Sequence, residues 1–303
     1  MISNIIGRYL LSKGLITSEQ LFILLLEKKR IHIKMGLIAV AEGFMTQTQA
    51  ELVYDYQSVM DKKFGEIAIE KGYLTEWEVE SLLDKQGDAY LAFAQALSNQ
   101  HLMNVEQLEE CMREFQREYH LTLPDMEDLK SNDADRILPI CMPAGCMSGG
   151  KNHYLHMAGT ALRTLIRLAD GDFCPKTAYF TKRCRVDNGV LQHMGGEQSI
   201  TCGIVGRDRA LVPIISALSK KRYREVNEEA LAYVGELLNS IEEIYAGNLR
   251  QSGILLEKEE LQSSVHMKEI TAPEMLVLPL HVMGEEFSLV IAEGNRVEMI
   301  VSD

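Results

Sequence analysis

The sequence predicts an α+β protein: an all-α domain of helical hairpins, followed by an α+β domain whose helices pack on an antiparallel-dominated sheet. Three observations carry this prediction. The chain has 303 residues, more than one ordinary hydrophobic core accommodates. A repeat organises its first part, and strand-like and helical patterns alternate in its last part. We place the repeats at residues 1–120, a linker at 121–136 and the second domain at 137–303.

The repeat has a period of 29 residues and four units. A capping box, in which a Thr or Asn and a Gln or Glu three residues later satisfy each other's backbone N–H, recurs at that period: Thr17 with Gln20, Thr46 with Gln49, Thr75 with Glu78, and Asn104 with Gln107. Two glycines precede each of the first three boxes, at Gly7, Gly36 and Gly65 and at Gly14, Gly43 and Gly72. The fourth unit has Ala94 and His101 there, so it is the degenerate copy. Each unit therefore predicts a short helix, a glycine turn and a longer capped helix, and the units predict a stack of hairpins.

The third unit, around residues 63–75, resembles the repeats at the N-terminus of type II secretion and type IV pilus assembly ATPases. Some members of that family bind cyclic di-GMP through a basic residue before the first glycine and a glutamine that ends the second helix. Lys34 with Gln57, and Lys63 with Gln86, occupy the matching positions. The resemblance thus implies these four residues as nucleotide-binding candidates. The alternative is a protein-docking repeat that uses the same capping pattern.

The stretch 121–136 is polar and breaks the period, which is typical of a linker. The glycine-rich segment 145–152 almost matches a phosphate-binding loop. Asn152 stands where the magnesium-binding hydroxyl belongs, so we interpret the segment as a turn that leads into a helix. Four nearby side chains have a spacing that no standard zinc site uses, and we predict no metal site there: Cys141, Cys146, His153 and His156.

The composition argues against several classes of function. The net charge of -13 argues against a nucleic-acid partner, because phosphate binding needs a basic surface. No apolar run approaches the roughly 20 residues of a membrane-spanning helix, and the start lacks the basic region of a secretory signal. The six cysteines follow no disulfide-framework spacing. We therefore expect a cytoplasmic protein without membrane insertion.

The last part of the chain predicts alternating elements. Helices are expected at 152–169, from Asp208 through Leu218, and in a long segment capped by Asn227. Strands are expected at 177–186 and 198–205, with Asn188-Gly189 as a turn signal between them. A hairpin of residues 276–282 and 287–292 around 283–286, and a strand at 296–301, complete the pattern.

The long helix carries Glu236-Leu237-Leu238-Asn239, and this E-x2-N pair, with a closing hairpin after it, resembles the CheC/CheX/FliY phosphatase family, CheX most closely. The resemblance implies removal of the aspartyl phosphate from a CheY-like response regulator in chemotaxis or two-component signalling. Glu236 would dock on the regulator's active-site lysine, and Asn239 would orient the attacking water. The resemblance also implies no cofactor of the chain's own, Mg²⁺ on the phosphorylated regulator, and a homodimer.

Two positions depart from the family pattern. Ala232 stands where the family has Asp or Ser, and Gln262 stands where it has proline. A second register, aligned on Gly247-Asn248, would put Ser240 and Glu243 at the motif positions and leave no active site. Glu236 could also belong to a merely acidic, solvated helix face. The alternative function is therefore a non-catalytic CheX-like scaffold whose repeats bind a protein partner or cyclic di-GMP.

Overall fold

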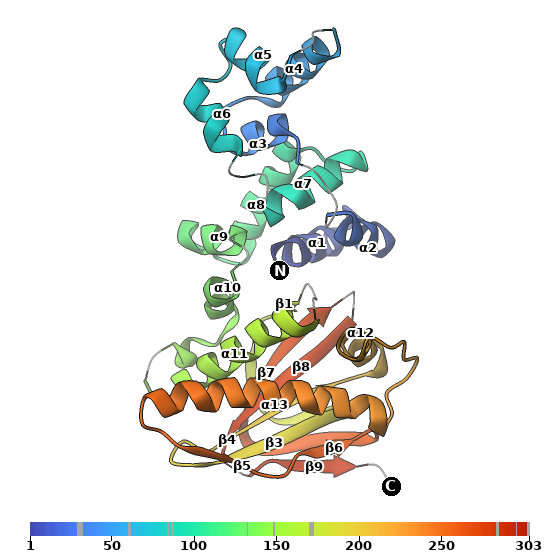
Figure 1. Ribbon diagram of the computed structural model, residues 1–303, viewed down its shortest axis with the longest axis vertical. Helices are drawn as coiled ribbons and strands as arrows, with labels where there is room; N and C mark the ends of the chain where they lie inside the picture. Colours follow the sequence, from blue (N-terminus) through green and yellow to red (C-terminus); the bar gives the residue numbers. More distant parts are fainter. Residues whose placement is uncertain are drawn as a thin grey trace. The chain divides into compact units, whose positions relative to one another are not determined.

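The computed structural model describes residues 1–28, 33–59, 62–83, 85, 88–131, 133–147, 149–169, 173–282, 285–294 and 296–301. Its internal contacts divide the chain into an N-terminal unit, residues 2–132, and a C-terminal unit that begins at residue 133 (Figure 1). That boundary falls inside the stretch 121–136. Among the described residues, none of the helices has the length and apolar character that crossing a membrane requires.

The N-terminal unit consists of paired helices, as the repeat predicts. The pairs are α1 (Ile2–Ser12) with α2 (Ser18–Glu27), α3 (Met35–Ala41) with α4 (Gln47–Val59), α5 (Phe64–Glu70) with α6 (Glu76–Leu83), and α7 (Ala89–Asn99) with α8 (Val105–Glu118). All four predicted capping boxes are present. In the first box, Thr17 N–H donates to Gln20 Oε1 at 2.8 Å and Gln20 N–H donates to Thr17 Oγ1 at 3.2 Å. The others repeat this reciprocal pattern at Thr46, Thr75 and Asn104.

The turns between paired helices share one backbone conformation. Gly14, Gly43 and Gly72 have left-handed φ angles of +70°, +74° and +69°. His101 occupies the same place in the fourth unit and keeps the conformation, with φ at +54°. A left-handed residue ends many helices and is usually glycine, because glycine has no Cβ to clash. The fourth unit therefore keeps the turn, although the left-handed backbone conformation is strained for its histidine.

The hairpins do not stack in chain order. The main contacts join α1 and α2 to α7, α3 to α7 and α8, and α4 to α5. The fourth hairpin thus lies between the first and the second, and the third lies at one end (Figure 1). Polar contacts follow the same order: Lys13 Nζ lies 2.6 Å from Glu118 Oε2, and Lys34 N–H donates to Gln95 Oε1 at 3.1 Å.

The expected linker 121–136 is largely helical instead. Residues Leu123–Lys130 form α9, and α10 (Ala134–Cys141) starts within the stretch. Thr122 and Asp125 form a capping box that the interrupted period concealed. Met126 and Leu129 are buried, and Lys130 Nζ lies 3.0 Å from Glu109 Oε1 on α8, so α9 belongs to the N-terminal unit.

The C-terminal unit is a curled antiparallel sheet covered by helices, which confirms the predicted α+β class. Its helices are α10, α11 (Asn152–Ala169), α12 (Asp208–Ser219) and α13 (Glu228–Gln251), with short 3₁₀ turns η2 (Ala144–Cys146) and η3 (Gly149–Lys151). Its strands are β1 (Cys174–Pro175), β2 (Tyr179–Arg185), β3 (Asn188–Gly196), β4 (Ile200–Gly206), β5 (Leu256–Lys258), β6 (Gln262–Ser264), β7 (Met267–Val282), β8 (Glu285–Glu293) and β9 (Glu298–Val301).

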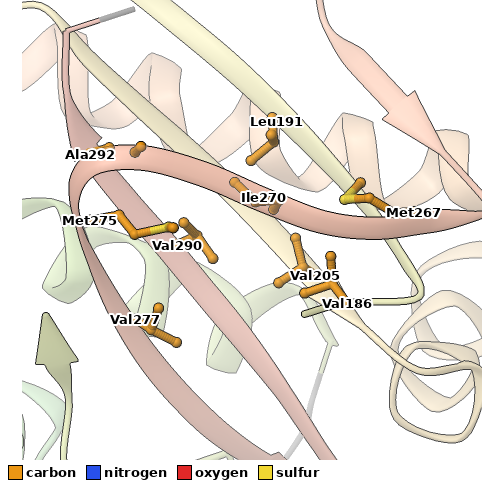
Figure 2. Close-up of a cluster of buried hydrophobic side chains, with 10 residues drawn as sticks. Val186, Leu191, Val205, Met267, Ile270, Met275, Val277, Val290 and Ala292 are labelled. Atoms are coloured by element: carbon orange, nitrogen blue, oxygen red, sulfur yellow. The ribbon is translucent and has the colours of Figure 1, made fainter. Parts of the chain in front are cut away.

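The strands pair in the order β1-β7-β8-β4-β3-β5, with β2 and β9 also on β7 and β6 on β3. Helices α11, α12 and α13 contact the β3, β4 and β8 part of the sheet (Figure 1). Figure 2 shows β7 bending so that Met267 and Ile270 meet Leu191, Val205 and Val290. The curl of β7 therefore builds an apolar cluster out of the sheet's own residues.

Most expected elements of this unit are present. The helix at 152–169 is α11, the strands at 177–186 and 198–205 are β2 and β4, and the strand at 296–301 is β9. The hairpin is formed by β7 and β8, while Met283 and Gly284 lie outside the described residues. Asn227 caps α13 through a 2.8 Å bond from Ala230 N–H to its Oδ1.

The turn expected at Asn188-Gly189 is wrong, because these residues open β3. Asn188 is buried and its Nδ2 donates to Asp208 Oδ1 at 2.7 Å. A Cβ at Gly189 would lie 2.6 Å from Val205 Cγ1 on the neighbouring strand, so this glycine permits a close strand contact instead of a turn. Asp208 is the first residue of α12, which has Arg207 as its N-cap.

Candidate functional site

The candidate site lies on α13, which is long and firmly anchored. Asn227 caps it, and Glu228 and Glu229 in the first turn suit the positive end of the helix dipole. Its inner face buries an apolar stripe against β3 and β4: Leu231, Val234, Leu238, Ile241 and Tyr245. Side chains on the opposite face are therefore held at defined positions along a rigid element.

Both residues of the predicted pair lie on that outward face. Glu236 is exposed and Asn239 is half-buried. Residues three apart on a helix are neighbours, so the carboxylate and the amide can meet one partner together. Ser240 and Glu243, from the second register, continue the same face, and Ser240 Oγ donates to the Glu236 carbonyl at 2.9 Å. The fold thus presents both candidate pairs side by side.

A loop segment packs against Gly235, the residue before Glu236. A Cβ at Gly235 would lie 2.6 Å from Leu261 Cδ2, so the absence of a side chain at Gly235 allows this approach. The two departures from the family pattern lie nearby: Ala232 is exposed one turn before Glu236, and Gln262 pairs with Leu191 in the β6–β3 ladder.

Lys258 joins this site although sequence reasoning did not select it. From β5, its Nζ lies 3.0 Å from Glu243 Oε1 and donates to Asn239 Oδ1 at 3.5 Å. Lys258 is 19 residues from Asn239 along the chain, on a strand of three residues. No local pattern connects the two, so only strand pairing brings this ammonium to the helix.

Glu242 is adjacent in sequence but lies on the opposite, buried face. Its side chain is fully buried, and neither carboxylate oxygen has a hydrogen-bond partner among the described residues. Desolvation raises the pKa of Glu242 to about 8, and the charge of Lys258 opposes part of that rise. Glu242 is therefore a core residue that is mostly protonated at neutral pH, and it is no part of the exposed site.

Among the described residues, the structure does not bring the nucleotide-binding candidates together in one cavity. Lys34 lines a cavity of about 390 Å³ with Gly36, Tyr54, Gln95 and other residues of the second and fourth hairpins. The lining of that cavity includes neither Gln57 nor Lys63. Gln57 Nε2 instead donates to the Lys62 carbonyl at 3.5 Å, and Gln86 lies outside the described residues. Nucleotide binding by these residues stays a prediction.

A larger cavity of about 980 Å³ lies between α11 and the C-terminal half of α13. It contains Asn152, His153 and His156 from the segment that almost matched a phosphate-binding loop. His153 Nε2 lies 3.1 Å from Glu293 Oε1, and burial lowers the pKa of His153, so this histidine adds no positive charge to the wall at neutral pH. Arg163 pairs with Asp135. Among the described residues, no group of three or more His, Cys, Asp or Glu side chains is arranged to hold a metal ion.

No protein-family model and no curated protein matches the sequence. Among solved structures, neighbours of the C-terminal half are CheX-like and CheC-like chemotaxis proteins, the group that the E-x2-N resemblance names. CheX from Desulfovibrio desulfuricans is 12% identical with a TM-score of 0.42 and covers 47% of this chain and 99% of its own. CheX from Vibrio vulnificus is 17% identical with a TM-score of 0.42 and the same coverage. A chain of the CheX–CheY–BeF3–Mg²⁺ complex from Borrelia burgdorferi is 14% identical with a TM-score of 0.37, and the match covers 47% of this chain and 98% of that chain. The resemblance of the N-terminal repeats to assembly ATPases stays a prediction.

Proposed function

We propose that the C-terminal unit removes the aspartyl phosphate of a response regulator, with Glu236 and Asn239 as the residues that meet the regulator. One observation supports this most: the two side chains share the outward face of a long helix whose other face is fixed in the core. Burial of either side chain would have prevented contact with a protein-bound phosphoryl group.

The chemistry demands little of the phosphatase. Water attacks phosphorus in line, the bond from phosphorus to the aspartyl oxygen breaks, and inorganic phosphate leaves with the proton from water. Mg²⁺ on the regulator neutralises the phosphoryl charge, so the phosphatase mainly positions the water, a contribution of up to about 7–11 kcal/mol in favourable cases. A neutral amide suits the task, because Asn239 can accept a hydrogen bond from water and donate one to a phosphoryl oxygen without adding negative charge. The Glu236 carboxylate can pair with a lysine ammonium of the regulator.

The test is the rate at which a phosphorylated receiver domain from the same organism loses phosphate. The chain should accelerate this loss over spontaneous hydrolysis, and Asn239→Ala should remove the acceleration with an unchanged circular-dichroism spectrum. Glu229→Gln changes an exposed acid on the first turn of the same helix and serves as the matched control. No acceleration with any receiver of that organism would refute the proposal, as would full activity of Asn239→Ala.

A second candidate function, protein docking by the N-terminal hairpins, is favoured by an irregularity of the repeat. Phe22 and Leu26 on α2 are 47% and 50% exposed. The other units carry charged residues at both positions: Glu51, Glu80 and Glu109 match Phe22, and Asp55, Asp84 and Arg113 match Leu26. An exposed apolar pair that replaces a charged one is typical of a contact surface.

The phosphorylated receiver is the probe for docking. The double variant Phe22→Glu, Leu26→Asp introduces the residues that the second unit has at these positions. In receiver dephosphorylation it should leave kcat unchanged while KM for the receiver rises severalfold. Glu51→Gln, at the matching position of the second unit, is the control. An unchanged KM would count against docking of the receiver by this surface. Heat released on titration of the chain with cyclic di-GMP would instead favour the nucleotide function.

A further inference from the structure

Lys258 is fixed in place by strand pairing. In the β5–β3 ladder, Lys258 pairs with Met194 and Leu256 pairs with Gly196. Leu256 is buried, and Glu259 N–H donates to the His193 carbonyl at 2.9 Å, so the backbone is held on both sides of Lys258. Its side chain is 30% exposed and extends to α13. The side chain that carries the ammonium therefore starts from a fixed backbone position.

The contact with Lys258 determines which atom of the Asn239 side-chain amide points toward the ammonium. An ammonium group only donates hydrogen bonds, so the Asn239 atom that meets it at 3.5 Å is the acceptor Oδ1. Nδ2 then points away from Lys258. Glu243, one turn further along α13, holds the same ammonium at 3.0 Å and keeps it between the two side chains.

We propose that Lys258 is a positioning residue of the phosphatase site, which orients the Asn239 amide and neutralises Glu243. This inference rests on the proposed function. With Oδ1 turned to Lys258, one lone pair remains for the attacking water, and the Nδ2 hydrogens face outward to a phosphoryl oxygen. Without the lysine, the amide samples a broad, roughly twofold torsion. The Glu243 carboxylate would also repel the phosphoryl group.

The kinetic test uses Lys258→Met, which keeps the side-chain length and removes the charge. We expect kcat of receiver dephosphorylation to fall about tenfold, the size of one hydrogen bond to a charged group, while KM changes less than twofold. Lys258→Arg restores a cationic donor and should recover most of the rate. Lys176→Met, which removes an exposed lysine paired with Glu286 on another part of the sheet, is the matched control and should retain the wild-type kcat.

A second readout does not depend on activity. The side-chain amide resonances of Asn239, assigned from their loss in Asn239→Ala, should shift in Lys258→Met and remain in place in Lys176→Met. Unshifted resonances in Lys258→Met would overturn the inference. An active wild type with equally active Lys258→Met would also overturn it, without touching the proposed function. A wild type with no activity would refute the proposed function, and the positioning role with it, even where the amide shifts.

Discussion

Replacement of Glu242 by Gln should stabilise the C-terminal unit in a pH-dependent way. Glu242 is fully buried on the inner face of α13, with no hydrogen-bond partner for its carboxylate oxygens among the described residues. Desolvation raises its pKa from 4.5 to about 8 in the folded chain. Folding therefore keeps a proton on this carboxyl that the unfolded chain releases above pH 4.5. Glutamine has similar shape and carries no charge at any pH.

The direction and size of the effect follow from proton linkage. Because the folded pKa is the higher one, the wild type loses stability as pH rises from about 4.5, and the loss levels off above about 8. A difference of 3.5 pKa units corresponds to at most about 5 kcal/mol. Between pH 5 and 8, the stability of Glu242→Gln relative to the wild type should rise by about 3–4 kcal/mol.

The assay must separate the two units. Cys202 is fully buried in β4, so we expect its thiol to react only when the C-terminal unit opens. Pulse labelling in urea, read at Cys202 by mass spectrometry, therefore reports that unit separately from the other free cysteines. Hydrogen exchange of the amides of α7, whose side chains are mostly buried, reports the N-terminal unit as an internal control. Glu229→Gln, an exposed acid at the start of the same helix, is the control, and its stability relative to the wild type should stay constant from pH 5 to 8. A difference between Glu242→Gln and wild type that stays constant from pH 5 to 8 would refute the reasoning.

Two glycine predictions concern packing and backbone strain. Gly203→Ala would place a Cβ over the Leu191 side chain and 2.8 Å from the Val190 carbonyl, and should cost about 1–3 kcal/mol by Cys202 labelling. Its control, Gly247→Ala, adds a methyl to an open helix position and should gain up to about 1 kcal/mol; equal effects of the two would contradict the packing argument. In the N-terminal unit, His101→Gly should stabilise by about 1 kcal/mol and Gly72→Ala destabilise by a similar amount, because both positions are left-handed. Hydrogen exchange of the amides of α7 in urea measures both, and a loss of stability in His101→Gly would show that the histidine makes a compensating contact.

Prediction from sequence succeeded where the signal is local. A capping box joins residues three apart, so the four boxes could be read as a period. The prediction of a turn at Asn188-Gly189 failed, because this pair of residues is compatible with either a turn or a close contact between strands. Only the contact of Gly189 with Val205 on the neighbouring strand decides between the two structures. Strands β5 and β6 have three residues each, too few to show an alternating pattern.

The sequence by itself determined the hairpin repeat, the α+β class of the second domain, and the helix that presents Glu236 and Asn239. All three are built from local patterns, such as capping boxes and the alternation of apolar residues within one helix or strand. Only the tertiary structure decided that the fourth hairpin lies between the first two, that β7 curls over its own sheet, and that Lys258 reaches Asn239. These depend on contacts such as that of Lys34 with Gln95, which are distant in the chain. Such contacts depend on how the whole unit packs, so a pattern of residues that are close in the sequence does not predict them.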